Sequence, residues 1–197
     1  MTSSPGSRLW GTGKRTRVLV LLSGGIDSAA LVSFYKRRRF AVVGLHFDYG
    51  QPSRRTESRA AARIADHFGI PLQRLRLSRR LSALNGEYWG RNAAFVLLAA
   101  GLYPGHAMIV GLGIHEGLTL YDSTGVFVAD LQRLLDGYSG GTLSLGAPFV
   151  NHSKAQIVAD CRRHRVPLHL TYSCERRSAP ACGKCPSCLD RRALHVD

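Results

Sequence analysis

The feature that most constrains this chain is an apolar run that ends in a glycine-rich hexad. Residues 18–22 read Val-Leu-Val-Leu-Leu, and Ser-Gly-Gly-Ile-Asp-Ser follows at 23–28. A short apolar run bounded by turn residues is typical of a strand buried on both faces of a parallel sheet. From Asp27 to Tyr35 the apolar side chains recur on one side, as they do in a helix. The chain therefore starts with a strand, a sharp turn and a helix.

The remaining chain alternates between strand-like and helix-like segments. The expected strands cover 17–22, 41–47, 71–77 and 107–113, and the expected helices cover 56–68, 91–102, 126–135 and 153–164. Gly69 is a helix stop, and Ser-Lys-Ala-Gln at 153–156 is a capping box. This alternation predicts an α/β fold, a doubly wound parallel sheet with right-handed crossovers. Ligands of such sheets bind beyond the carboxyl ends of the strands.

The glycine hexad has the composition of a phosphate cradle. Two glycines allow the backbone N–H groups to form a concave nest, and the following helix adds its N-terminal dipole. Ser23 and Ser28 can donate hydroxyl hydrogen bonds, whereas Asp27 faces phosphate unfavourably and is expected to act through Mg²⁺ or to orient the loop. The absence of Gly-Lys-Ser/Thr separates this loop from a Walker P-loop. The plain alternative is a strand–helix turn without chemistry.

Four cysteines near the end of the chain form a second motif. Cys174, Cys182, Cys185 and Cys188 have C-x7-C-x2-C-x2-C spacing. Four thiolates suit a closed, tetrahedral, structural zinc site, and an iron–sulfur cluster is the alternative. Because no secretion signal precedes them, a disulfide network is disfavoured. Cys161, midway along an expected helix, is expected to be buried and to behave as a small apolar residue.

Length and charge narrow the class of protein. The 197 residues correspond to one domain with a small appendage, and 27 Lys and Arg against 13 Asp and Glu give a net charge of +14. The basic residues are scattered along the sequence, and most of them are Arg. An Arg-rich composition therefore accounts for the positive charge better than a dedicated nucleic-acid-binding face does. No apolar run approaches the ~20 residues of a membrane span. Residues 1–16 are expected to be a disordered basic tail and the protein cytoplasmic.

Taken with its neighbours, the hexad resembles the PP-loop of ATP pyrophosphatases, which have an adenine nucleotide alpha hydrolase-like fold. Four further motifs, Asp48-Tyr49-Gly50-Gln51, Gly90-Arg91-Asn92, Gly111 and Lys154-Ala155, occur with the cysteine array in one order. This ordered set resembles the 7-cyano-7-deazaguanine synthase family. The resemblance implies a PP-loop ATP-binding domain at 17–170 and a zinc-binding element at 171–197.

The resemblance also implies roles for individual residues. The catalytic residues would be Asp27, Arg91 and Lys154, although a solvated helix N-terminus explains Lys154 equally well. The ATP-binding residues would be Leu22, Ser23, Gly24, Gly25, Ile26, Asp27, Ser28, Leu45, His46 and Gly111. The substrate-binding residues would be Tyr49, Gln51, Arg91, Asn92, Glu116 and Asp122.

The implied reaction is an ATP- and Mg²⁺-dependent ligation. ATP adenylates the carboxylate of 7-carboxy-7-deazaguanine, ammonia displaces AMP to give the amide, and a second activation at the amide oxygen gives the nitrile. The partners would be the carboxylate, free ammonia and, because relatives are dimeric, a second copy of the chain. No membrane partner is expected and a nucleic-acid partner is not favoured.

Two stretches depart from the family pattern. Pro52-Ser53 stands where the family has Arg-His, and 116–124 differ from its substrate loop, so Glu116 and Asp122 either contact substrate or belong to a solvated loop. The first hypothesis is therefore the nitrile-forming ligase, followed by a diverged relative that activates another carboxylate or stops at the amide. A tRNA-modifying PP-loop enzyme and a non-enzymatic zinc ribbon that binds nucleic acid complete the alternatives.

Overall fold

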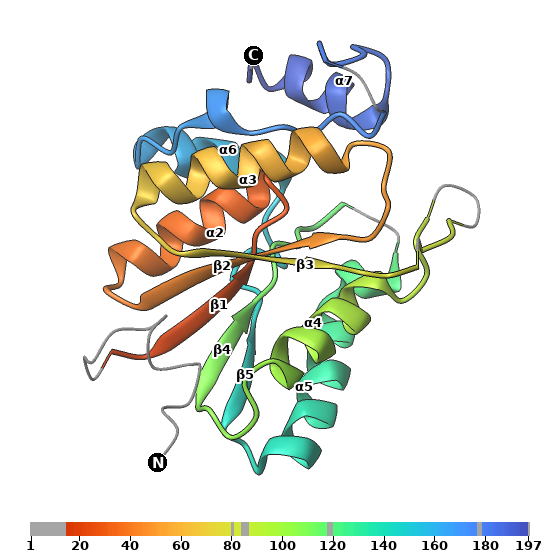
Figure 1. Cartoon of the computed structure of the whole chain (residues 1–197). Helices are drawn as coiled ribbons and strands as arrows, with labels where there is room; N and C mark the ends of the chain where they lie inside the picture. The colour runs from red at the N-terminus through yellow and green to blue at the C-terminus, as the bar shows by residue number, and fades with distance from the viewer. Residues whose placement is uncertain (1–14, 80, 84–86, 118–119, 177–178, 197) are drawn as a thin grey trace.

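The structure is a computed structural model that describes residues 15–79, 81–83, 87–117, 120–176 and 179–196. Most of the basic tail expected at 1–16 lies outside these residues. Figure 1 shows a central sheet with helices on both faces and the C-terminal segment above one of the two helix layers.

The sheet confirms the expected doubly wound α/β fold. Its five parallel strands lie in the order β3-β2-β1-β4-β5. Their bounds are β1 Arg17–Leu21, β2 Ala41–Asp48, β3 Leu72–Arg76, β4 Met108–Gly111 and β5 Leu143–Gly146. The strand order reverses beside β1, at whose carboxyl end the glycine hexad lies, so the hexad occupies the usual ligand position of such sheets.

Two layers of helices cover the sheet. One face carries α2 (Ile26–Arg37), α3 (Arg54–Phe68) and α6 (Lys154–Arg163), and the other carries α4 (Arg91–Gly101) and α5 (Gly125–Ser139) (Figure 1). Successive side chains of a strand point to opposite faces. Val18 and Val20 therefore pack against α2 and α6, whereas Leu19 packs against α4 and α5.

Several expected boundaries need correction. The strand expected at 107–113 ends at Gly111, because residues 112–113 leave the sheet to line a cavity. The helix expected at 126–135 runs from Gly125 to Ser139, between the Thr124 cap and Gly140 in the left-handed conformation. The strand β5 was not predicted, because it has only four residues, of which two are buried, too few for a clear alternation. The short helix α7 (Pro186–Ala193) was not predicted either.

Other local predictions are confirmed. Gly69 ends α3 in the left-handed conformation, and the Ser153–Gln156 capping box opens α6 with both of its hydrogen bonds. Two 3-10 turns, η1 (Tyr121–Ser123) and η2 (Leu168–Leu170), connect elements. Among the described residues, no helix is long and apolar enough to cross a bilayer.

Candidate functional site

The glycine hexad forms a tight turn between β1 and α2. Gly24 has a φ of +94°, and a Cβ atom there would lie 2.7 Å from the backbone oxygen of Glu57. Only glycine meets both conditions without strain. Gly25, in extended conformation, caps α2. The loop is therefore held by its own backbone against the start of α3.

Serine hydroxyls satisfy the polar groups of this turn. The N–H of Gly24 donates to Ser28 Oγ and the N–H of Gly25 donates to Ser23 Oγ, each over 3.2 Å. Ser28 Oγ in turn donates to the carbonyl of Gly25 over 2.9 Å. The amides of Gly24 and Gly25 are thus ordered by hydroxyl groups of the loop. The loop lies at the start of α2, where the helix dipole favours an anion.

Asp27 and Lys154 form an ion pair across the loop. Lys154 Nζ lies 2.7 and 2.6 Å from the two carboxylate oxygens of Asp27, and each side chain is roughly one-fifth exposed. Asp27 belongs to the first turn of α2 and Lys154 to the first turn of α6. The tertiary structure therefore brings together two residues that are 127 positions apart.

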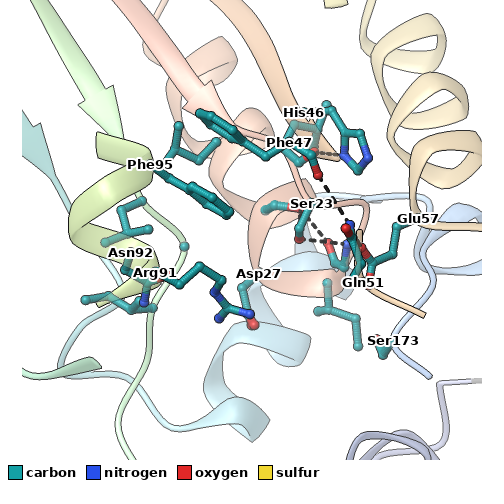
Figure 2. Close-up of a pocket in the computed structure, with 18 of the residues that line it drawn as sticks. Ser23, Asp27, His46, Phe47, Gln51, Glu57, Arg91, Asn92, Phe95 and Ser173 are labelled. Carbon is teal, nitrogen blue, oxygen red and sulfur yellow. Dashed lines mark hydrogen bonds between the residues drawn. The ribbon is translucent and has the colours of Figure 1, made fainter. Parts of the chain in front are cut away.

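A cavity of about 320 Å³ opens in front of the hexad. Residues predicted for ATP or substrate line most of it: Leu22, Ser23, Gly25, Ile26, Asp27, Ser28, Leu45, His46, Tyr49, Gln51, Arg91, Asn92 and Lys154. Figure 2 shows Arg91 reaching from α4 toward Asp27. The cavity is thus lined by two cationic side chains, Arg91 and Lys154, together with the glycine loop.

Four predicted site residues do not line this cavity. Gly24 lies behind the loop against α3, and Gly111 lies within β4, where a Cβ would contact Leu31 and Tyr35. Glu116 is exposed, and Asp122 offers its backbone carbonyl to Asn92 Nδ2 over 3.0 Å. Their predicted contacts with ATP or substrate stay predictions.

Arg91 is positioned by aromatic side chains. Its Nη1 donates to the hydroxyl of Tyr49 over 3.2 Å, and its guanidinium carbon lies 5.9 Å from the ring centres of both Tyr49 and Tyr88. Burial raises the pKa of Tyr49, so this hydroxyl stays protonated and neutral. The guanidinium charge is therefore not neutralised by its nearest partner.

His46 is a buried neutral base beside the cavity. Its Nδ1 donates to the carbonyl of Leu22 over 3.0 Å, and its Nε2 has no hydrogen-bond partner in the described part of the chain. Burial lowers the pKa of His46 below its usual range, because the charged form loses its hydration. The ring therefore contributes no positive charge near neutral pH.

The four cysteines of the C-terminal array converge as expected. Their sulfur atoms all lie within 4.8 Å of one another, and three of the four residues are buried. Backbone N–H groups of Cys182 and Lys184 point at cysteine sulfurs over 3.4 and 3.5 Å. This cluster can hold a metal ion. Cys161 is separate and fully buried, and burial raises the pKa of its thiol to about 12.

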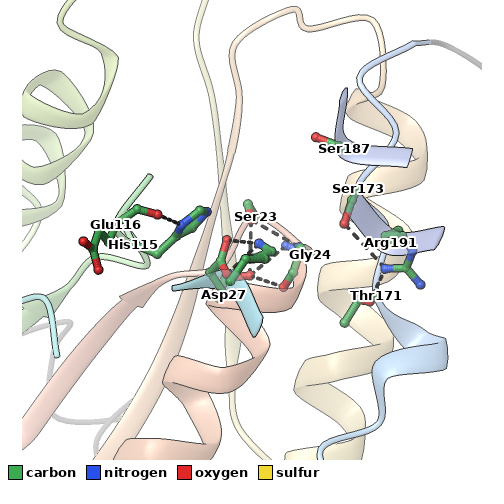
Figure 3. A network of polar contacts seen from close by, with 12 residues as sticks. Ser23, Gly24, Asp27, His115, Glu116, Thr171, Ser173, Ser187 and Arg191 are labelled. Atoms are coloured by element: carbon green, nitrogen blue, oxygen red, sulfur yellow. Dashed lines mark hydrogen bonds and ion pairs between the residues drawn. The ribbon is translucent and has the colours of Figure 1, made fainter. Parts of the chain in front are cut away.

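The cysteine element forms one wall of the cavity. The N–H of Tyr172 donates to the carbonyl of Gly24 over 2.9 Å, and Ser173 and Ser187 line the cavity. Arg191 of α7 donates to Thr171 Oγ1 over 2.8 Å and to Ser173 Oγ over 3.5 Å (Figure 3). The element is thus fixed directly to the glycine loop.

Comparison with known proteins identifies the family. The family model described as "Queuosine biosynthesis protein QueC" matches residues 17–89 and 87–196. The chain belongs to the QueC family. It is 35% identical over 210 residues to the 7-cyano-7-deazaguanine synthase of Rhizobium meliloti (strain 1021), covering 91% of this chain and 88% of that protein. It is 30% identical to the synthase of Campylobacter curvus (strain 525.92), covering 87% and 89%.

Solved structures support the fold alone. The NMN synthetase of Francisella tularensis matches with a TM-score of 0.52 and 14% identity, covering 82% of this chain and 66% of that one. The NH3-dependent NAD synthetase of Campylobacter jejuni matches with a TM-score of 0.50 and 16% identity, covering 82% and 72%.

Several cavity residues of this QueC-family chain were not predicted from the sequence. Glu57 accepts hydrogen bonds from Gln51 Nε2 over 2.7 Å and from Ser53 Oγ over 2.5 Å, and it lines the cavity. The family pattern has an acidic residue shortly after Tyr-Gly-Gln, and this could have indicated Glu57. It did not, because Pro52 and Ser53 differ from the family's residues just before it. No sequence motif predicted that Ser173 or Ser187 lines the cavity. They reach it because the cysteine element folds back against the glycine loop.

Proposed function

We propose that this protein is a 7-cyano-7-deazaguanine synthase, an ATP-dependent ligase that forms carbon–nitrogen bonds. ATP transfers AMP to the carboxylate of 7-carboxy-7-deazaguanine and releases pyrophosphate. Ammonia then displaces AMP and gives the amide. A second ATP transfers AMP to the amide oxygen and releases pyrophosphate, and loss of AMP and of both N–H protons leaves the nitrile. Support comes from the names of the relatives and from the composition of the cavity.

The observation that carries this proposal is the convergence of three features in one cavity. The glycine loop, Arg91 and Lys154 come from different elements and line the same space. Adenylation brings a carboxylate toward a phosphate, and both are anions. Two cations and a set of oriented amides are what this step needs, because they offset the repulsion and the charge that develops. The loop would bind phosphate oxygens while Arg91 orients the acid.

Lys154 and Asp27 have linked roles in this proposal. In the structure each neutralises the other. A bound nucleotide would draw Lys154 to its phosphates and free the Asp27 carboxylate for a cation. The residues thereby change partner without leaving the cavity.

The residues also fit the two metals expected. The Asp27 carboxylate is a hard oxygen ligand of the kind that Mg²⁺ takes beside phosphates, and Mg²⁺ would supply further neutralisation there. The four thiolates fit a structural Zn²⁺, with no position left for a reacting water.

The direct test is product analysis. Protein incubated with ATP, Mg²⁺, ammonium and 7-carboxy-7-deazaguanine should give the mass of the nitrile with two AMP formed per product. ATP turnover with other carboxylates and none with this one would reject the proposal.

One observation favours a second function. Glu116 and Asp122, the acids expected on the substrate, do not line the cavity. A diverged enzyme that stops at the amide, or activates another carboxylate, needs neither residue in the family's position. Accumulation of the amide with one AMP per product, at saturating ATP and ammonium, would identify that enzyme.

We also propose a homodimer in the cytoplasm that uses free ammonia. Four large apolar side chains of the helix layer formed by α4 and α5 are exposed: Leu98 of α4, Leu102, which caps the end of that helix, and Leu134 and Tyr138 of α5. Exposed apolar side chains are candidates for contact between two copies of a chain. Light scattering should give twice the chain mass, and Leu98→Glu should shift it to the monomer.

A further inference from the structure

A second depression lies on the outer side of α3 and β3, away from the glycine loop. Its volume is about 580 Å³, and it is lined by Asp48, Arg54, Arg55, Ser58, Arg59 and Arg76. Arg74 of β3 adds a fifth guanidinium nearby, with Nε donating to Ser58 Oγ over 3.2 Å. β3 is the edge strand of the sheet, and α3 runs along it (Figure 1). We call these five arginines the α3–β3 arginine surface.

Three of these arginines, Arg54, Arg55 and Arg59, differ from the arginines that join elements elsewhere in the molecule. Arg37, for example, pairs with Asp160 over 3.2 Å, and Arg162 donates to the carbonyl of Leu194 over 2.6 Å. Within the described ranges, the guanidinium groups of Arg54, Arg55 and Arg59 have no hydrogen-bond or ion-pair partner.

The acid in this depression offsets little of the charge. Asp48 Oδ1 already accepts a hydrogen bond from the N–H of Gly50 over 3.1 Å, and Oδ2 lies 3.9 Å from Arg76 Nε. Arg55 and Arg59 are four residues apart on α3, and Arg63 is four residues further. Like charges at this spacing destabilise a helix by about 0.2–0.5 kcal/mol per pair. The row of like charges on α3 therefore lowers the stability of the folded protein.

We propose that the α3–β3 arginine surface binds the phosphodiester backbone of a nucleic acid, independently of base sequence. Guanidinium forks match phosphate oxygens in geometry and charge. The depression is lined by no apolar or aromatic side chain, as expected for contact with a polyanionic backbone and unlike the apolar centre of a protein–protein interface. It also offers no ring on which a base could stack.

This surface is separate from the proposed nucleotide cavity. Glu57 points from α3 toward the cavity and binds Gln51, whereas Arg54, Arg55 and Arg59 line the outer depression. The site goes beyond the proposed ligase activity. It also replaces the sequence-based view that the basic residues are merely scattered, because β3 and α3 bring Arg76 beside Arg55.

The test compares two triple variants with equal loss of charge. Arg54→Gln/Arg55→Gln/Arg59→Gln removes three arginines of the surface. Arg15→Gln/Lys36→Gln/Arg163→Gln removes three exposed cations outside it, which precede β1 or lie in the last turns of α2 and α6. Anisotropy of a labelled 20-base-pair duplex is measured across salt concentrations, and ATP binding is measured in parallel. Each lost phosphate contact should reduce the slope of log affinity against log salt by about 0.9.

We expect the surface variant to bind the duplex at least tenfold more weakly, with a slope reduced by about 2–3, and to bind ATP as the parent does. The control variant should lose threefold or less. Equal losses in both variants would overturn the proposal, because net charge alone would then explain binding. Displacement of the duplex by equimolar pyrophosphate would identify a small-anion site instead, and equally tight binding of polyglutamate would identify an acidic protein as the partner.

Discussion

The cavity has two walls of different origin. One is the glycine loop, in which residues 23–28 bond to one another and the geometry follows from neighbouring residues. The other contains Tyr172, Ser173 and Ser187, which the cysteine element carries to the loop from the far end of the chain. The shape of the first wall is determined by residues close in sequence, whereas the position of the second wall is determined by the cluster of cysteine thiols. This difference leads us to expect that the glycine loop keeps its shape by itself, whereas the closed shape of the cavity depends on the cysteine cluster and on any metal ion that it binds.

Loss of a cysteine ligand should have the largest effect. A structural thiolate site contributes directly to folding, so Cys185→Ser should lose its metal and become poorly soluble. At low temperature, amide exchange should show the Tyr172 N–H unprotected while the loop amides stay protected. Cys161→Ala is the matched control, since this buried cysteine is apart from the cluster and the variant should retain its metal. Protected Tyr172 in metal-free protein would contradict the dependence of this wall on the metal.

A change in the loop wall should affect chemistry rather than folding. Asp27→Asn keeps the side-chain size but removes the charge that pairs with Lys154. We expect AMP formation to fall about a hundred- to thousandfold, with metal content and thermal unfolding close to the parent's. Elemental analysis and single-turnover AMP release provide the measurements. Undiminished AMP release would remove Asp27 from the site.

The loop glycines offer a matched pair for stability. Gly24→Ala forces a left-handed backbone and places Cβ against the Glu57 carbonyl, so it should lower the free energy of unfolding by about 2–4 kcal/mol. At Gly25 the φ is −82° and the nearest atom to a new Cβ is 3.4 Å away. Gly25→Ala should therefore cost less than about 1 kcal/mol. Equal losses in urea unfolding would show that the loop is not held by its backbone.

The smallest expected effect concerns pH. Burial lowers the pKa of His46 in the folded state, so the unfolded chain takes up its proton first as pH falls below about 6.5. Stability should therefore decline from pH 6.5 downward, with a slope of at most about 1.4 kcal/mol per pH unit from this residue. His46→Asn should flatten the decline, whereas the exposed control His67→Gln should leave it unchanged. An unaltered slope in His46→Asn would assign the pH dependence to other groups.

The two walls were not equally predictable. Strand, glycine turn and helix depend on residues close in sequence, so the loop, the capping box and the Gly69 stop could all be predicted. The cysteine spacing predicted a metal site for the same reason. The family pattern indicated Arg91 and Lys154 as site residues, but no sequence rule predicted that Lys154 binds Asp27, because their contact depends on how α6 packs beside α2.

The sequence by itself determined the α/β alternation, the glycine loop and the set of thiols, since each is encoded by local periodicity or spacing. The tertiary structure alone decided that Ser173 and Ser187 close the cavity, that Glu116 and Asp122 lie outside it, and that five arginines gather beside β3. These features depend on long-range packing, in which small shifts of whole elements set which side chains meet. Local sequence patterns do not predict those shifts.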